Sequence, residues 1–105
     1  MCIRDRFYTA RLAHFLKRLN ERKVNGVSLL KQSMVLYGCA TSDGNRHTHD
    51  NLPVILAGHA NGKLNPGFHR KYDDTPMCNL FVNMLGIFGT PVKSFGNSNG
   101  RLAVI

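Results

Sequence analysis

A polar segment near the middle of the chain, residues 41–51, carries the densest group of ionisable side chains in the sequence. Asp43, His47 and His49 offer one carboxylate and two imidazoles, a donor set that can hold zinc, manganese or iron. In an extended stretch His47 and His49 point to the same side, and Gly44 allows a tight turn behind Asp43. We therefore predict a divalent-metal site in this segment. The alternative is an ordinary polar loop, in which histidine and aspartate serve to close turns.

Other catalytic signatures are absent from the sequence. It contains no G-x-S-x-G nucleophile motif, no G-x-x-x-x-G-K-[ST] phosphate loop and no G-x-G-x-x-G dinucleotide turn. The cysteines, Cys2, Cys39 and Cys78, match neither a zinc knuckle nor a C-x-x-C redox pair. We expect Cys39 and Cys78 to be buried as small apolar residues. The absence of these motifs from the sequence leaves open whether the protein is an enzyme.

Two short apolar runs flank the polar segment. Residues 34–39 and 52–58 are too short for lone helices, so they predict strands that are covered on both faces. Together with a preceding helix they predict the open sheet of an α/β protein, with helices packed on the sheet. Because the connection between them has crossover length, we expect the two strands to pair in parallel. Ligands of such sheets bind beyond the carboxyl ends of strands, and the polar segment begins at one such end.

Two amphipathic helices are predicted around these strands. The first covers residues 7–23 and stops at Asn25-Gly26, and residues 28–32 are suited to one further helical turn. The second begins with Thr75 as its N-cap and Pro76 at the first helical position, and it ends at Gly89. Their apolar stripes comprise Tyr8, Leu12, Phe15, Leu16 and Leu19 in the first helix, and Met77, Leu80, Phe81, Met84, Leu85 and Phe88 in the second.

Turn residues between the second strand and the second helix predict a short hairpin. Asn-Gly at 61–62 and Asn-Pro-Gly at 65–67 bracket it, and it returns through residues 68–72. The tail, residues 94–100, is rich in glycine and asparagine and is predicted to be irregular. Three histidines are assigned to no metal, namely His14 in the first helix and His59 and His69 on the surface of the hairpin.

The positive charge of the chain is an ambiguous signal. The net charge is +8, which favours a nucleic-acid partner at first sight. Seven of the fourteen lysines and arginines, however, fall within residues 4–23, as expected for the solvated face of one helix. No interleaving of basic and aromatic residues suggests an RNA-binding sheet, so we expect no nucleic-acid partner and keep a basic nucleic-acid module only as a third hypothesis. No apolar run approaches the roughly 20 residues of a membrane helix, so no membrane span is expected.

The first six residues and the expected burial of the strands suggest that this chain is a piece of a larger protein. Residues 1–6, MCIRDR, resemble the translated adapter sequence often found at the start of metagenomic genes, so we exclude them from the fold as a non-native leader. We interpret residues 7–105 as the C-terminal part of a single larger α/β domain. Strands that are buried on both faces need neighbouring strands, and this sequence barely supplies them. The missing N-terminal part is therefore expected to be the chain's principal partner.

Residues 33–102 closely resemble the C-terminal end of a bacterial family catalogued as Domain of Unknown Function 1552. The matching pieces, in order, are SMVLYG, SDGNRHTHDNLPVILAG, KLNPGFHRKY, TPMCNLFVNMLGIFGTPV and SFGNSNGRL, and the first helix also fits. Members of this family are much longer and bear export signals, and the family has no established activity. The resemblance implies that the full-length protein is secreted or periplasmic.

A more distant likeness is to the alkaline phosphatase and sulfatase superfamily. In that superfamily a strand ending in Ser-Asp-His-Gly is followed by a strand such as VPLIV, a Pro-Gly hairpin and a terminal helix. This sequence has the same order of elements, namely MVLYGCATSDG, LPVILAG, NPG and the predicted second helix. The likeness implies that Asp43 binds a metal. Gly44 stands where the motif has histidine, a place that His47 or His49 would have to fill. The superfamily's nucleophile and remaining ligands would lie upstream of this chain.

The resemblances imply a fragment of an open alkaline phosphatase-like sheet with flanking helices and a short hairpin. The corresponding function is that of an exported metal-dependent hydrolase-like protein acting on phosphate or sulfate esters, with a small-molecule or polymeric substrate. The alternative is a non-catalytic binding or structural protein that kept the fold and lost the site. Gly44 favours the second hypothesis, and the cluster of Asp43, His47 and His49 favours the first.

Overall fold

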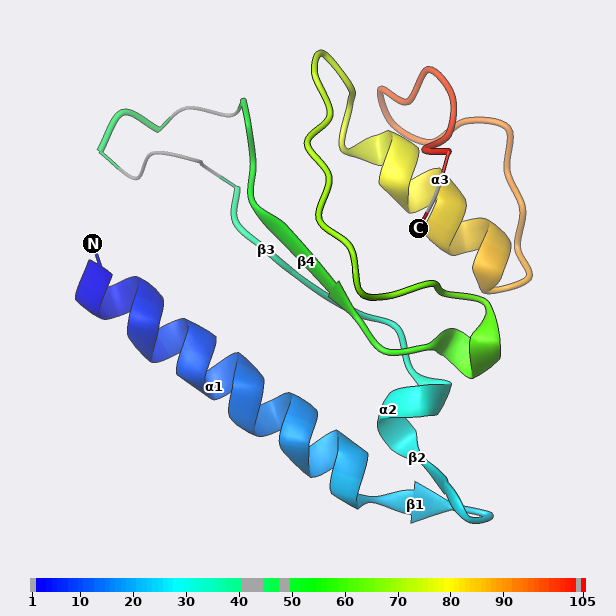
Figure 1. The fold of residues 1–105 in the computed structure, drawn as a ribbon. Helices are drawn as coiled ribbons and strands as arrows, with labels where there is room; N and C mark the ends of the chain where they lie inside the picture. The colour runs from blue at the N-terminus through cyan, green and yellow to red at the C-terminus, as the bar shows by residue number, and fades with distance from the viewer. Residues whose placement is uncertain (1, 41–44, 48–49, 104) are drawn as a thin grey trace. The chain divides into compact units, whose positions relative to one another are not determined.

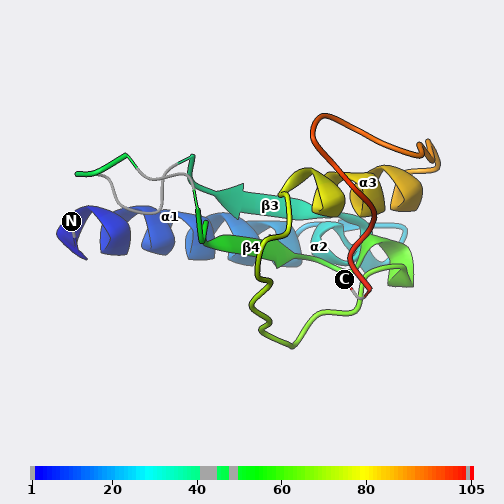
Figure 2. The same cartoon turned by 90° about the horizontal axis from the view of Figure 1, so that it is seen from above.

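The structure is a computed structural model that describes residues 2–40, 45–47, 50–103 and 105. The chain forms two compact units, Met1–Gly62 and Lys63–Ile105, and each contains helical structure (Figures 1 and 2). Both small sheets belong to the first unit. The predicted mixture of helices and strands is therefore confirmed at the level of a small α/β protein.

The first unit opens with a long helix, α1 (Cys2–Glu21), close to the predicted position. The helix also includes residues 2–6, which we exclude from the sequence-based fold. Of the predicted apolar stripe, the three leucines are half-buried, whereas Tyr8 and Phe15 remain 52% and 51% exposed. The predicted helix therefore forms, but the aromatic side chains of its apolar stripe remain exposed to solvent in this chain.

A tight turn follows α1. Strands β1 (Lys23–Val24) and β2 (Val27–Ser28) pair antiparallel, and the two residues between them, Asn25 and Gly26, have φ angles of 53° and 79°. Positive φ at both positions is the signature of a type I′ hairpin turn, for which Asn-Gly is the preferred pair. The predicted role of Asn25-Gly26 as the helix stop is therefore wrong: α1 already ends at Glu21, and the two residues form the turn of a small hairpin.

The predicted further helical turn is confirmed as α2 (Leu29–Gln32). Ser28 is its N-cap, and its hydroxyl accepts a hydrogen bond of 3.2 Å from the backbone N–H of Lys31. This bond satisfies one of the free N–H groups at the start of the helix.

The two apolar runs form strands β3 (Val35–Gly38) and β4 (Val54–Ala57), but their predicted parallel pairing is wrong. They pair antiparallel, with Val35 opposite Ala57 and Gly38 opposite Val54 (Figure 1). A parallel pair needs a crossover that carries the chain back to the start of the first strand, usually through a helix. No helix occurs in the described part of residues 39–53, and the chain returns directly along β3.

The expectation that both strands are buried on both faces is also wrong within this chain. Leu36 is 37% exposed and Ile55 is 44% exposed. A two-stranded ribbon covers little of its own surface and is of marginal stability on its own. Among the described residues no third strand joins β3 and β4, so the ribbon leaves apolar side chains open on both faces.

A close backbone approach fixes the end of the ribbon to α2. The N–H groups of His59 and Ala60 donate to the carbonyls of Leu30 and Ser33, over 3.4 and 3.0 Å. Gly58, between them and β4, is buried and has a φ of 101°. A Cβ at this position would collide with the Ser33 carbonyl. Glycine is therefore required here for its conformation and for its lack of a side chain.

The predicted hairpin after β4 does not form. In its place lie a short 3₁₀ turn, η1 (Ala60–Gly62), and an irregular segment that runs on to the last helix. A hairpin needs two flanking runs that alternate apolar and polar residues. The residues around the Asn-Pro-Gly turn are mostly basic and exposed, and Leu64 alone is buried among residues 63–72.

The second unit is organised around α3 (Cys78–Ile87), which begins later than predicted. Thr75 does not cap it, because its hydroxyl instead donates to the carbonyl of Asp73 over 2.9 Å. Met77 is the N-cap residue and makes no side-chain capping bond. The predicted stop at Gly89 is confirmed: this residue has a φ of 88°, and its N–H donates to the carbonyl of Gly86.

The described core is small and lies in the second unit. Its buried hydrophobic side chains are Leu64, Leu80 and Val82, with exposed fractions of 4%, 8% and 1%. Phe88, which the sequence places on the same stripe as Leu80, is 75% exposed. Of the predicted apolar stripe of α3, Leu80 is buried and its neighbours in the central turns are half-buried, whereas the C-terminal end of the stripe is exposed. The fully buried Val82 lies outside the predicted stripe.

Two asparagines on α3 hold the irregular tail by backbone-like hydrogen bonds. The side-chain amide of Asn79 donates to the side-chain oxygen of Asn99, and its own oxygen accepts from the backbone N–H of Asn99, both over 2.9 Å. One turn later, the amide of Asn83 donates to the carbonyl of Leu102 over 3.0 Å and accepts from its N–H over 2.8 Å. Each side-chain amide thus uses one N–H donor and its oxygen acceptor on the tail, in the way that a peptide group pairs in a sheet.

We expect Asn79→Ala to lower the free energy of unfolding by about 2 kcal/mol, because it removes two hydrogen bonds at a buried position. Asn97→Ala, at an exposed position in the same tail, is the control and should change stability by less than about 0.5 kcal/mol. Urea denaturation followed by circular dichroism measures both. Equal effects of the two substitutions would contradict a specific role for the Asn79 amide.

Candidate functional site

The candidate metal loop, residues 39–53, connects the paired ends of β3 and β4. Because Gly38 lies opposite Val54, the loop starts and finishes at adjacent backbone positions. The sequence analysis places the loop beyond the carboxyl end of a parallel strand, whereas it is in fact the connection of an antiparallel pair. The strands therefore bring the two ends of the loop together.

His47 is the one predicted ligand that falls within the described residues. It lies in a turn with Asn45 and Arg46, its side chain is exposed, and its φ is 55°. Histidine is one of the few non-glycine residues that are enriched in this left-handed region. The turn presents the imidazole to solvent, where it is accessible to a metal ion.

The other two predicted ligands, Asp43 and His49, lie outside the described residues. Among the described residues no three His, Cys, Asp or Glu side chains form a group that could hold a metal. The three-residue metal site consequently stays a prediction from sequence. The remaining histidines, His14, His59 and His69, are all exposed.

The cysteines differ from their predicted environment. Cys39, directly after β3, is exposed, which corrects the expectation that it is buried. The reason is that the ribbon is uncovered at the end where β3 stops. Cys78 is half-buried at the start of α3, and its sulfur would lie 2.8 Å from a Cβ at Gly96. Gly96 therefore allows the tail to pass close to this thiol.

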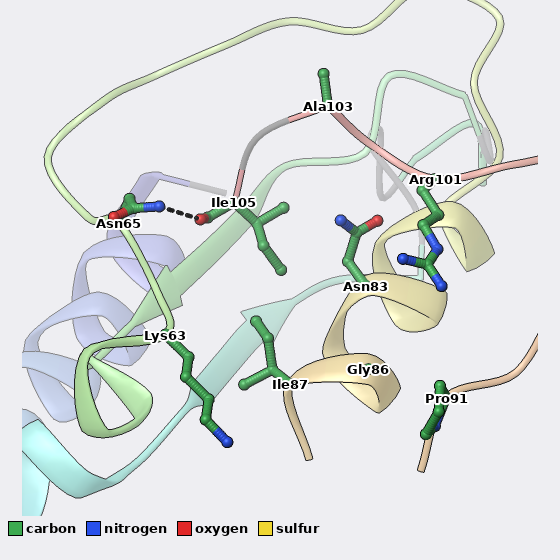
Figure 3. Close-up of a pocket in the computed structure, with 9 residues that line it drawn as sticks. All are labelled: Lys63, Asn65, Asn83, Gly86, Ile87, Pro91, Arg101, Ala103 and Ile105. Atoms are coloured by element: carbon green, nitrogen blue, oxygen red, sulfur yellow. Dashed lines mark hydrogen bonds between the residues drawn. The ribbon is translucent and has the colours of Figure 1, made fainter. Parts of the chain in front are cut away.

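The second unit contains a feature that the sequence analysis does not predict, an open hollow of about 610 Å³ (Figure 3). Helix α3 contributes Asn83, Gly86 and Ile87, the tail contributes Arg101, and the segment after η1 contributes Lys63. Asn83 is a polar residue on a mostly apolar helix, but this alone does not indicate a hollow. Arg101 and Lys63 are separated by much of the unit's sequence and carry no motif.

No helix of the described chain has the length and apolar character needed to cross a membrane. Comparison of the chain with models of protein families, with curated proteins and with solved structures finds no match.

Proposed function

We propose that this chain contributes a metal-binding loop to an exported, metal-dependent hydrolase-like protein that acts on phosphate or sulfate esters. The observation that carries the proposal is the antiparallel pairing of β3 with β4. It brings the two ends of the segment that contains Asp43, His47 and His49 to adjacent backbone positions, and the side chain of His47 is exposed. The resemblance to the alkaline phosphatase and sulfatase superfamily supplies the substrate class and the assignment of Asp43.

The donor set of this loop fits a divalent metal. One carboxylate and two neutral imidazoles are typical protein ligands of zinc and related ions, and three protein ligands leave coordination positions open. A bound metal would activate a nucleophile and stabilise charge on the ester oxygens. The chain's own contribution is to hold the ligands on one hairpin loop, while the nucleophile and further ligands would come from the missing N-terminal part.

A second function is favoured by a different observation. In the first unit no hydrophobic side chain of the described residues is fully buried, and Leu36 and Ile55 are open on the β3–β4 ribbon. Open apolar strands are suited to association with further strands. A non-catalytic binding or structural protein that kept the fold and lost the site needs such packing but needs no metal.

Replacing Asp43 by asparagine in the longer protein should lower its metal content, because a neutral amide is a poorer ligand for a divalent cation than a carboxylate. The measurement is elemental analysis of the purified protein. Asp73→Asn is the control, since this carboxylate is largely exposed in the second unit and lies outside the loop.

Hydrolysis of aryl phosphate and aryl sulfate esters by the same longer protein separates the two functions. Metal binding with hydrolysis supports the enzyme, and metal binding without hydrolysis supports the non-catalytic protein. Absence of metal, together with no effect of Asp43→Asn, would show that the loop is an ordinary polar connection. We expect the 105-residue chain to be inert by itself, because it carries no activated nucleophile.

A further inference from the structure

The hollow in the second unit is cationic. Lys63 and Arg101 both line it; the described lining includes no aspartate or glutamate, and its one anionic group is the α-carboxylate of Ile105, so the two cations leave a net positive charge. Within the described residues neither cation forms an ion pair with a carboxylate. Figure 3 shows the two side chains entering the hollow from different segments of the unit, Arg101 beside Asn83 and Lys63 beside Ile87. Their charges are therefore available to a ligand.

The polar lining offers donors in excess of acceptors. Asn83 uses one N–H of its amide on the Leu102 carbonyl, and its oxygen accepts from the Leu102 N–H. The second N–H of that amide remains available among the described groups. Arg101 adds a planar guanidinium, which suits the paired oxygens of a carboxylate or a phosphoryl group.

The remaining wall is apolar. Ile87 on α3, together with Pro91 and Ala103, gives the hollow a hydrocarbon surface next to its charged groups. Gly86 leaves the helix surface bare at this point, and a Cβ built there meets nothing within 4 Å. A ligand can therefore lie close to the helix backbone.

We propose that this hollow binds a small organic oxyanion, with Lys63 and Arg101 attracting its charged head and with its apolar body against Ile87. The excess of donors selects a negative head group, and the apolar wall favours an organic anion over an inorganic one. The site is separate from the metal loop and does not depend on the proposed hydrolytic function.

The test is a titration of the 105-residue chain followed by NMR chemical shifts, with EDTA present so that no metal contributes. The probes are benzoate and phenylphosphonate as the two head groups, inorganic phosphate without an apolar body, and benzyl alcohol without a charge. We expect benzoate, phenylphosphonate or both to bind, and the tighter-binding of these two anions identifies the preferred head group. Inorganic phosphate and benzyl alcohol should bind more weakly than that anion. Arg101→Gln and Lys63→Gln should each raise the dissociation constant roughly three- to tenfold, as for a solvent-accessible charged pair.

Two variants keep the test decisive. Lys93→Gln removes an exposed cation of the same unit that does not line the hollow, and it should leave binding unchanged. Gly86→Leu should fill the hollow and abolish binding while helix α3 is retained, because leucine is a better helix former than glycine. Failure of both aromatic anions to bind would overturn the proposal. Equal losses in Lys93→Gln and Arg101→Gln would also overturn it, since they would indicate only general charge attraction.

Discussion

Replacing Gly58 by alanine is expected to destabilise the protein by about 3 kcal/mol or more. Two costs combine at this position: its φ of 101° is unfavourable for any residue with a side chain, and the new methyl group would collide with the Ser33 carbonyl. Relief of the collision requires β4 to move away from α2, which weakens the hydrogen bonds from His59 and Ala60. The midpoint of urea denaturation should fall accordingly.

Gly62→Ala is the matched control for this prediction. Gly62 also has a positive φ, 89°, but a Cβ there meets nothing within 4 Å. Its replacement should therefore cost only the conformational part, about 1–2 kcal/mol. If the two alanine variants unfold at the same denaturant concentration, the close approach of Gly58 to Ser33 is not a feature of the folded protein.

Leu80→Ala should lower the free energy of unfolding by roughly 2–5 kcal/mol. Leu80 is 8% exposed and lies in α3, two residues before the fully buried Val82. Truncation loses the transfer free energy of the removed groups and leaves a cavity. Denaturation monitored by circular dichroism measures the change.

Phe88→Ala tests whether the loss of stability at Leu80 comes from its burial or simply from removing a hydrophobic side chain of the same helix stripe. Phe88 is the larger side chain, but it is 75% exposed, so its removal should change stability by less than about 0.5 kcal/mol. A loss for Phe88→Ala as large as that for Leu80→Ala would show that the end of α3 is packed in solution.

Local patterns predict where most elements lie. The apolar spacing of the first helix and Gly89 at the end of α3 act through neighbouring residues, and both predictions are confirmed. Asn25-Gly26 does form a turn, but it is the turn of a hairpin that follows the end of α1. Both strands are also found close to their predicted positions. Thr75 shows the limit of such signals, because two acceptable local hydrogen bonds compete and its hydroxyl bonds to Asp73 instead.

Long-range pairing is not encoded in these local patterns. The loop between the strands is long enough for a crossover or for a direct return, so the direction of pairing could not be predicted from its length. The same holds for the contacts of Asn79 and Asn83 with the tail, since an asparagine amide has no sequence signature for its partner.

The sequence predicts which residue types make up the candidate metal site, but it does not predict their geometry. The order of Asp43, His47 and His49 in one polar segment indicates metal chemistry, but the positive φ of His47 departs from the extended stretch assumed for the two imidazoles. The common orientation of His47 and His49 therefore has no support from alternation along a strand. The hollow lined by Lys63 and Arg101 is assembled from distant segments and has no local signal.

Calorimetric titration of the longer, metal-free protein with zinc is the most direct test of the metal loop, because further ligands are expected from outside this chain, and His47→Asn is the decisive variant. Asparagine accepts the φ of 55° found at this position, so the turn is preserved while the imidazole is lost. The control is His59→Asn, at an exposed histidine outside the loop. We expect the unaltered longer protein and its His59→Asn variant to bind zinc with the same affinity, and His47→Asn to bind at least about tenfold more weakly. Absence of zinc binding, or equal weakening in both variants, would contradict a metal-binding role for this loop.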